Sequence, residues 1–403
     1  MTGFPPRLSA YEGVAPPGAI RLVRYLARDL AGKSFLHVNS TREGGGVAEI
    51  LNRLLPLMDE LGIRTRWEVI SGPPEFFVAT KRIHNTLQGA DLPFTKAHRE
   101  VFLETSRAAV RQLDLGADLV MIHDPQPAAL VEARASGASR WIWRCHIDLS
   151  HPARATRSFL EPFVRRYDGA VFHLAEFAWR IPIPRYLIHP SIDPLSDKNR
   201  DMDEKEVERR VSALGVPLDR PILLQVSRFD PFKDPLGVIR AFRLVRKVRD
   251  CVLVLAGGGA SDDPEGAEVL ARVREEAADS PDIHVLLLPN DAHLDVNALQ
   301  RAAAVVIQKS TREGFGLTVA EAMWKAKPVV GGAVGGITRQ IQDGVTGYLV
   351  HSVEGCAYSL RRLLNDPGER RRMGELGREH ARRNLLITRH LADYLQLLRL
   401  HAA

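Results

Sequence analysis

The strongest constraint on the fold is a repeating pattern in which a short apolar run is followed by a Gly- or Asp-containing loop and then by an amphipathic stretch of helical length. This pattern continues through most of the chain and is typical of parallel sheets whose strands are joined by crossover helices. The strands expected in the first half are Ser34–Asn39, Arg66–Ile70, Leu119–His123, Trp141–Cys145 and Ala170–His173. Those expected in the second half are Ile222–Val226, Val252–Ala256, Ile283–Leu287, Val305–Gln308, Val329–Gly331 and Tyr348–Val350.

A polar segment without apolar periodicity, Pro190–Arg200, separates the two halves and is interpreted as a linker. A chain of 403 residues is also longer than the chains that usually form a single hydrophobic core. We therefore predict an α/β protein with two doubly wound, Rossmann-like domains, residues 1–194 and 195–384, facing each other across a cleft. The stretch Asn199–Leu214 is expected to form the helix that opens the second domain.

The composition is that of an ordinary soluble globular protein, with 45% hydrophobic and 26% charged residues. The net charge of +6 could suggest a nucleic-acid partner, but the basic residues are scattered among 49 acidic ones. The densest basic run, Arg370–Arg372 with Arg378, Arg382 and Arg383, has helical spacing beside Glu369, Glu375 and Glu379 and predicts a solvated helix face. No nucleic-acid partner is expected.

Cysteine usage favours a reducing compartment, because the three cysteines are far apart and show no CxxC spacing. Residues 1–10 carry prolines and polar residues where a secretory signal needs an unbroken apolar run. No later segment has membrane-spanning length. These features predict a cytoplasmic protein without a membrane partner.

Directly after the expected strand Ile222–Val226 comes a loop, Ser227–Asp234, with the sequence SRFDPFKD. Its Arg228 and Lys233 can bind one anion together. The planar Arg guanidinium offers paired N–H donors, and the flexible Lys ammonium offers a single positive charge. Such a pair suits a diphosphate leaving group. A surface loop with two ordinary charges is the alternative, and the position after a core strand favours the anion site.

A second motif, Glu313–Glu321 with the sequence EGFGLTVAE, follows the strand Val305–Gln308. Gly314 and Gly316 let the backbone approach a ligand closely, and the helix that follows presents N–H groups to phosphate oxygens. Glu313 precedes this helix and Glu321 lies about two turns into it. A single glutamate could be an ordinary solvent-facing residue, whereas the pair with the glycines predicts a site for sugar and ribose hydroxyls on either side of a phosphate.

Two further glycine runs follow strands. The segment Glu43–Glu49, EGGGVAE, opens a helix with three glycines, which places backbone amides toward a ligand, although a plain tight turn is the alternative. The run Ala256–Gly259 is a weaker signal for close approach to a nucleotide.

Polar residues end two strands of the first domain, in the segments His123–Gln126 and Cys145–Asp148. We expect them to face the cleft and to bind sugar hydroxyls. A metal site built from His123, Asp124, His146 and Asp148 is the alternative, but the segments lack the HxxxH spacing of a helical zinc site. No GxSxG elbow or P-loop supports acyl transfer or NTP hydrolysis.

With these residues assembled, the chain resembles the retaining GT-B glycosyltransferases of family 4, whose pattern pairs an Arg and a Lys with two glutamates spaced E-x7-E. Here the pattern is Arg228, Lys233, Glu313 and Glu321. The resemblance implies that Arg228 and Lys233 bind the donor diphosphate, that Glu313 binds the donor sugar and that Glu321 binds ribose. It further implies donor contacts from Gly45, Gly46, Gly314, Phe315, Gly316, Leu317 and Thr318.

On the acceptor side, the resemblance makes His146 the cleft histidine near the transferred sugar and Asp124 an acceptor carboxylate. Asp148 and Glu49 are further acceptor-side candidates, and Arg228, Lys233, Glu313 and His146 form the expected catalytic set. The resemblance also implies that the final helix, residues 385–403, packs back onto the first domain.

Within this family, the segments His37–Glu49, Val226–Gly237 and Gln308–Glu321 are most similar to those of the trehalose glycosyltransferring synthases. The similarity implies reversible transfer of glucose from ADP-, UDP- or GDP-glucose to free glucose, giving α,α-trehalose. It implies no cofactor and no metal site, with Mg²⁺ stimulation as an open expectation, and a homodimer is expected. A trehalose phosphorylase, a transferase for another small acceptor, a sugar-nucleotide epimerase and a nonenzymatic binding protein are the alternatives.

Overall fold

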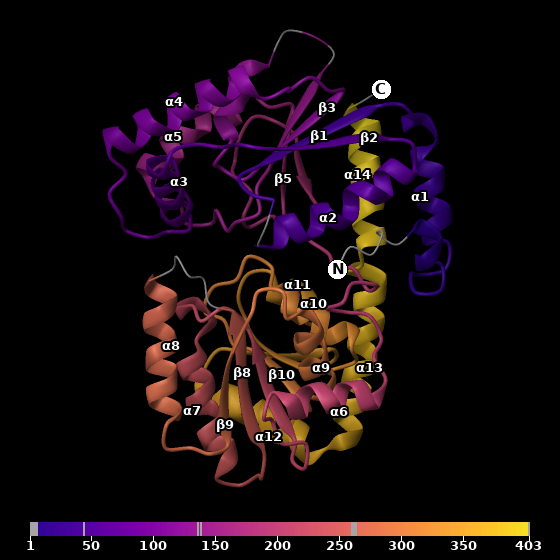
Figure 1. The fold of residues 1–403 in the computed structure, drawn as a ribbon, viewed down its shortest axis with the longest axis vertical. Coiled ribbons are helices and arrows are strands. Elements are labelled where there is room, and N and C mark those ends of the chain that lie inside the picture. The colour runs from indigo at the N-terminus through magenta and orange to yellow at the C-terminus, as the bar shows by residue number, and fades with distance from the viewer. Residues whose placement is uncertain (1–6, 43–44, 135–136, 138, 259–263, 402–403) are drawn as a thin grey trace. The chain divides into compact units, whose positions relative to one another are not determined.

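The protein is represented by a computed structural model that describes residues 7–42, 45–134, 137, 139–258 and 264–401 (Figure 1). It consists of two compact units. The first comprises Met1–Pro190 with Ile387–Ala403, and the second comprises Ser191–Leu386. These boundaries lie a few residues from the predicted ones. Each unit is built on a six-stranded parallel sheet, so the predicted pair of parallel α/β domains is confirmed.

The sheet of the first unit has the strand order β2-β1-β3-β4-β5-β6. Its strands are β1 (Ser34–Asn39), β2 (Arg64–Val69), β3 (Leu119–His123), β4 (Arg140–Arg144), β5 (Gly169–Phe172) and β6 (Arg185–Leu187). Every neighbouring pair is parallel, with Ile122 of β3 opposite both Val38 of β1 and Trp143 of β4. The carboxyl ends of all these strands therefore lie at one edge of the sheet, where ligands bind in open α/β folds.

Helices of the first unit form two groups. One group contains α1 (Ala19–Ala27), α2 (Gly45–Glu60) and the final helix α14 (Ile387–His401), and Figure 1 shows the yellow α14 beside α1 and α2. The other contains α3 (Pro74–Leu87), α4 (Lys96–Gln112), α5 (Arg154–Val164) and the short 3₁₀ segment η3 (Ala128–Ala133). The last 17 residues of the chain thus complete the unit that contains its N-terminal part.

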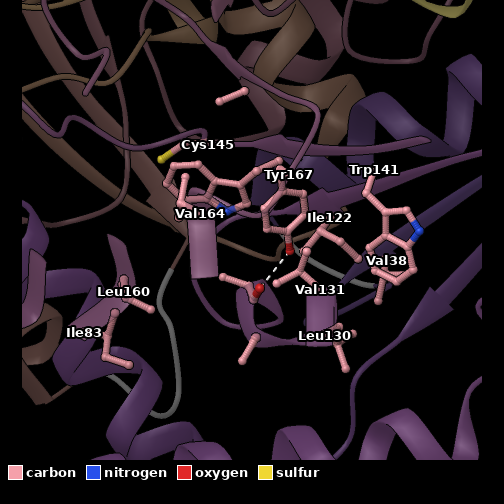
Figure 2. Packing of buried hydrophobic residues seen from close by; sticks show 14 of the residues in the cluster. Val38, Ile83, Ile122, Leu130, Val131, Trp141, Cys145, Leu160, Val164 and Tyr167 are labelled. Carbon is pink, nitrogen blue, oxygen red and sulfur yellow. Dashed lines mark hydrogen bonds between the residues drawn. The ribbon is translucent and has the colours of Figure 1, made fainter. Parts of the chain in front are cut away.

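The main core of the first unit lies between the sheet and the second helix group, and Figure 2 shows part of it. Val38 and Ile122 from the strands meet Leu130, Val131 and other residues that are almost fully buried. The Tyr167 hydroxyl at its centre donates a hydrogen bond of 2.7 Å to the Ala128 carbonyl, which satisfies a polar group that would be costly to bury alone.

The second unit has the strand order β12-β11-β10-β7-β8-β9. Its strands are β7 (Ile222–Val226), β8 (Val252–Gly258), β9 (Ile283–Leu288), β10 (Val305–Gln308), β11 (Val329–Gly332) and β12 (Gly347–Val350). Its helices are α6 (Glu204–Ala213), α7 (Pro235–Arg246), α8 (Pro264–Ala277), α9 (His293–Ala302), α10 (Leu317–Trp324), α11 (Ile337–Gln340), α12 (Val353–Asn365) and α13 (Pro367–Asn384), with the 3₁₀ segment η4 (Pro231–Lys233). The core packs α7, α8 and α12 against the sheet.

Two expectations about elements are corrected. The helix expected over Asn199–Leu214 begins at Glu204, because the Asn199 side chain donates to the Asp193 carbonyl at 3.0 Å and holds this segment as a loop. The Asp203 carboxylate then caps the helix by accepting from the Glu206 N–H at 2.7 Å. Strand β6 was missed, since it has three residues, none of them buried. Among the described residues, no helix is both long enough and apolar enough to cross a membrane.

Candidate active site

Lys233 and Glu313 form an ion pair at the carboxyl edge of the second sheet. Lys233 ends η4, which follows β7, and Glu313 lies in the loop after β10, the neighbouring strand. Lys233 Nζ donates to Glu313 Oε2 at 2.6 Å, and the two side chains are 18% and 9% exposed. Gln308 Nε2 and Ser310 Oγ also lie within hydrogen-bond distance of this oxygen, at 3.3 and 3.2 Å. The predicted cation and carboxylate are therefore brought together.

The two loops that carry this pair are joined through their backbones. The Thr311 N–H donates to the Phe232 carbonyl at 2.8 Å, and Gln225 Nε2 donates to the Lys233 carbonyl at 2.8 Å. Asp234 adopts a left-handed conformation with φ of 48°, caps α7 through the Gly237 N–H and forms an ion pair with Lys309. The positions of the two loops are thus fixed by contacts within the chain itself.

Arg228 does not join the pair formed by Lys233 and Glu313. Its side chain is 65% exposed and forms an ion pair with Asp230 at 3.3 Å. A guanidinium in this position is accessible to an anion, because a largely exposed ion pair contributes little stability and opens easily.

The segment around α11 contacts the glycine-containing loop before α10 and restricts its position. Gly316 has φ of 83° and is the N-cap residue of α10, whose first residues are Leu317 and Thr318. The Gly336 N–H donates to the Glu313 carbonyl at 3.3 Å, and a Cβ on Gly336 would lie 2.4 Å from the Phe315 Cα. This close approach fixes the loop, while the first N–H groups of α10 have no partner within the helix and can bind an anion.

Glu321 belongs to a second, more deeply buried group. It is 3% exposed, and its two carboxylate oxygens lie 3.6 Å from Lys198 Nζ and 3.5 Å from Gln300 Nε2. Lys325 Nζ donates to the Glu321 carbonyl at 3.2 Å and to Asn199 Oδ1 at 2.9 Å. Burial lowers the pKa of Lys325 to about 7, although the Glu321 carboxylate opposes this shift. Neither Lys198 nor Lys325 was identified from the sequence.

In the first unit, Asp124 and His146 are in direct contact. Asp124 Oδ1 accepts a hydrogen bond of 2.7 Å from the His146 N–H. Asp124 has φ of 66°, and its carbonyl accepts from Trp143 Nε1 at 2.9 Å. Burial raises the pKa of Asp124 to about 7, against the opposing effects of the His146 N–H and the Arg144 guanidinium. Arg144 is itself fully buried and donates to the Ile188 carbonyl at 2.8 Å.

The remaining candidates of the first unit lie around the same edge of the sheet. Asp148 accepts from the Ser150 N–H at 2.8 Å and is half-buried. Gly45 and Gly46 open α2, and Glu49 lies in the second turn of that helix. Glu43 and Gly44 of the triple-glycine motif, and Gly259 of the other glycine run, lie outside the described residues.

Four histidines of the first unit form a hydrogen-bonded chain that was not predicted from the sequence. His123 Nε2 lies 2.9 Å from His37 Nδ1, His123 Nδ1 lies 2.9 Å from His146 Nε2, and His146 Nδ1 lies 3.2 Å from His173 Nε2. His123 and His146, which were considered as metal ligands, are therefore bonded to each other. Within the described ranges, no group of three or more His, Cys, Asp or Glu residues is arranged to hold a metal ion. The available signal was a histidine near the carboxyl end of each of four strands.

Both halves of the chain are similar to known protein families. A family profile described as "Trehalose synthase, N-terminal domain" matches residues 37–179, and one described as "Glycosyl transferases group 1" matches residues 206–380. A trehalose synthase of Pyrococcus horikoshii is 44% identical, over 97% of this chain and 96% of its own length. The chain belongs to the trehalose synthase family.

Members of the trehalose synthase family are glycosyltransferases, and the fold of this member agrees with that of other GT-B enzymes. A UDP-forming α,α-trehalose-phosphate synthase from Burkholderia xenovorans, solved in complex with glucose-6-phosphate, superposes with a TM-score of 0.74 at 16% identity. The match covers 91% of this chain and all of that one. A trehalose phosphorylase of Pleurotus pulmonarius is a more distant relative, 27% identical over 97% of this chain but 60% of its own length.

Proposed function

We propose that this trehalose synthase family member transfers glucose from a nucleoside diphosphate glucose to free glucose, with retention, forming α,α-trehalose and a nucleoside diphosphate reversibly. The observation that carries the proposal is the contact between Lys233 and Glu313 beside the N-terminus of α10. A cation, a helix N-terminus and a carboxylate at one sheet edge suit a ligand that joins a diphosphate to a sugar. The UDP-forming synthase of the same fold supports this class of donor.

On the donor side, Lys233 and Arg228 bind the diphosphate together with the backbone N–H groups from Gly316 to Thr318. Glu313 and the loop Gly314–Leu317 bind the glucose hydroxyls, Glu321 binds the ribose, and Gly45 and Gly46 approach the donor through their backbone. Donor binding must loosen the 2.6 Å ion pair, because the diphosphate competes with Glu313 for Lys233. The sugar hydroxyls then donate hydrogen bonds to the Glu313 carboxylate, which is no longer paired with Lys233.

On the acceptor side, His146 lies near the transferred sugar, and Asp124, Asp148 and Glu49 bind the second glucose. The hydrogen bond from the His146 N–H to Asp124 Oδ1 supports this grouping, because it fixes the backbone at the end of β4. Asp124 therefore contributes both a polar group and a constraint on His146.

The chemistry that these residues suit is front-face substitution. The bond from the anomeric carbon to the diphosphate breaks, the acceptor oxygen attacks from the same face, and a departing phosphate oxygen takes the acceptor's proton. No carboxylate is assigned as a nucleophile, in contrast to retaining glycosidases. Lys233, Arg228 and the start of α10 stabilise the negative charge that grows on the diphosphate, and preorganised donors lower a barrier most at such a position. These cations replace a metal ion in the scheme, so activity is expected without one, although Mg²⁺ could stimulate it.

The proposal includes a cytoplasmic location and a homodimer. The thiols of Cys145, Cys251 and Cys356 are buried and unpaired, as suits a reducing compartment. Light scattering on the purified protein would measure its assembly state.

The deciding experiment is incubation of the purified protein with glucose and ADP-, UDP- or GDP-glucose in turn, without added metal, followed by NMR of the disaccharide. Trehalose with release of one nucleoside diphosphate is expected, and the base that supports it identifies the donor. A parallel reaction with glucose 1-phosphate and glucose tests the phosphorylase alternative, which the Pleurotus relative makes the leading competitor. Trehalose in that reaction alone would replace the proposal with a phosphorylase.

A further inference from the structure

Four histidines stand in a row across the carboxyl edge of the first sheet. The strands β1, β3, β4 and β5 are consecutive neighbours in that sheet, and each supplies one histidine within two residues of its carboxyl end. The members of this row, called the histidine chain below, are His37, His123, His146 and His173. They are separated in sequence by up to 136 positions and are brought together by strand order alone.

The spacing of the rings follows from the spacing of the strands. Neighbouring parallel strands lie about 4.7–4.9 Å apart, and an imidazole that bonds through both nitrogens spans nearly this distance. The centroids of each successive pair of rings are 5.2 Å apart. The bonded nitrogens are 2.9, 2.9 and 3.2 Å apart, which are hydrogen-bond distances.

The protonation of the chain is strongly restricted by its geometry. A neutral imidazole carries one N–H donor and one acceptor nitrogen. His123 and His146 use both nitrogens, so each must accept from one neighbour and donate to the other. The chain therefore has two possible sets of hydrogen bonds. In one set each histidine donates to the next from His37 toward His173, and in the other each donates in the opposite direction. Burial supports neutral rings, because it lowers the pKa of His37 to about 3 and places those of the other three well below their usual value.

We propose that His37 and His123 are positioning residues for His146, fixing which of its ring nitrogens carries the proton and holding the ring for the transferred sugar. This inference rests on the proposed function in one respect, the contact of residue 146 with that sugar. His146 is the partly buried member of the chain, whereas the other three are buried. A ligand would therefore meet the chain at His146.

The state of the chain decides what His146 offers to a hydroxyl. Both of its ring nitrogens are bonded to other histidines, so a sugar hydroxyl that binds the ring must replace one of them. The bond to His173 is the longer one, at 3.2 Å, and is the easier to replace. His146 Nδ1 then donates to the hydroxyl in one arrangement and accepts from it in the other. The protonation of His37, at the far end of the chain, is thereby coupled to whether His146 donates to the hydroxyl or accepts from it.

The first test is spectroscopic and needs no turnover. Two-bond ¹H–¹⁵N correlation spectra of histidine-labelled protein report which ring nitrogen of each imidazole is protonated. His37→Phe keeps the ring volume but removes the bond to His123, and we expect the ¹⁵N shifts of His146 to move although the substituted residue does not touch it. His37→Asn places an amide near the position of Nδ1 and should restore the wild-type shifts. Tyr394→Phe is the matched control, because it removes one buried polar atom beside the His37 ring without breaking a chain bond.

The second test is kinetic, on the same variants. His37→Phe should lower kcat by about 10- to 100-fold, the size of the loss when the outer partner of a metal-binding histidine is removed. The KM for the donor should change less, because the nucleotide contacts lie in the second unit. His37→Asn should recover most of the activity. If His37→Phe does not fold, His37→Leu, which also removes the bond to His123, is compared with His37→Asn in its place.

The outcomes separate this inference from the proposed function. Unchanged His146 shifts, or an unchanged kcat in His37→Phe, would overturn the positioning role even if the wild-type protein makes trehalose. Wild-type protein that forms no disaccharide would overturn the proposed function, and the spectra would still decide whether the chain sets the protonation of His146.

Discussion

Lys233 Nζ and Glu313 Oε2 lie 2.6 Å apart, although 80 positions separate the two residues in the sequence. The contact exists because β7 and β10 are neighbours in the sheet and the loops after them are joined through Thr311 and Phe232. In this structure, the cation that we propose for the donor diphosphate is thus paired with the carboxylate that we propose for the donor sugar. Under the proposed function, the diphosphate of a nucleotide sugar pairs with Lys233 while its sugar hydroxyls donate to Glu313.

Replacement of Lys233 tests this arrangement. Lys233→Ala should lower kcat by roughly 10²- to 10³-fold at saturating donor, as removal of one preorganised donor to a growing negative charge does in other enzymes. Lys247→Ala, at an exposed lysine just beyond α7, is the control and should keep wild-type turnover. Steady-state kinetics with each nucleotide sugar give the measurement. Near-normal turnover of Lys233→Ala would remove this residue from the site.

The close approach of Gly336 to the donor loop gives a second prediction. In Gly336→Ala the new Cβ would lie 2.4 Å from the Phe315 Cα and 2.7 Å from the Gly314 carbonyl oxygen, so the loop must shift. We expect a loss of about 1–3 kcal/mol in the free energy of unfolding, as for other overpacked sites, together with a higher KM for the donor. Gly355→Ala, within α12 and with ordinary contacts, is the matched control and should be neutral or stabilising. Urea unfolding and donor titration measure the two effects, and equal behaviour of the variants would contradict the prediction.

The half-buried carboxyl of Asp124 predicts a pH-dependent stability. Its pKa rises from 3.8 to about 7 on folding, so between these values the folded protein binds more protons than the unfolded chain. This group therefore makes the free energy of unfolding fall as pH rises, by up to about 1.4 kcal/mol per pH unit. In Asp124→Asn, which tolerates φ of 66° and keeps an acceptor for the His146 N–H, that contribution should disappear.

The measurement for Asp124 is urea unfolding of wild type and Asp124→Asn at several pH values from 4 to 8. The buried histidines produce the opposite slope below pH 6.5 in both proteins, so the difference between the two curves isolates the carboxyl. Asp219→Asn, at an exposed carboxyl, should reproduce the wild-type curve. A constant difference between wild type and Asp124→Asn across the range would show that the carboxyl does not titrate there.

Lys325 predicts a slope of opposite sign in alkaline solution. Burial lowers its pKa from 10.5 to about 7, so between these values the unfolded chain holds a proton that the folded protein has released. The free energy of unfolding should therefore rise with pH over this range, by up to about 1.4 kcal/mol per unit. Lys325→Met should reduce this slope, whereas Lys247→Met should leave it unchanged. Denaturant unfolding from pH 7 to 10 makes the comparison, and parallel curves for wild type and Lys325→Met would rule out a neutral buried lysine.

Much of the fold could be predicted from local sequence patterns. The strands Ser34–Asn39, Leu119–His123, Ile222–Val226 and Val305–Gln308 have the predicted bounds, because a buried parallel strand is a continuous apolar run bounded by loop residues. The positions of Lys233 and Glu313 in the loops after two such strands could also be predicted from the sequence. The helix start predicted at Asn199 from periodicity was wrong, because side-chain hydrogen bonds to the backbone compete with the helix there.

The sequence by itself determined the class of fold and the loops that carry the candidate residues, since both depend on neighbours along the chain. The tertiary structure decided which of those residues meet. Strand order joined Lys233 to Glu313 and lined up His37, His123 and His146, while Arg228 paired with Asp230 instead. The physical reason is that hydrogen bonds and ion pairs act over a few ångströms. Side chains become partners only when the lateral order of the strands brings distant segments of the chain within that range.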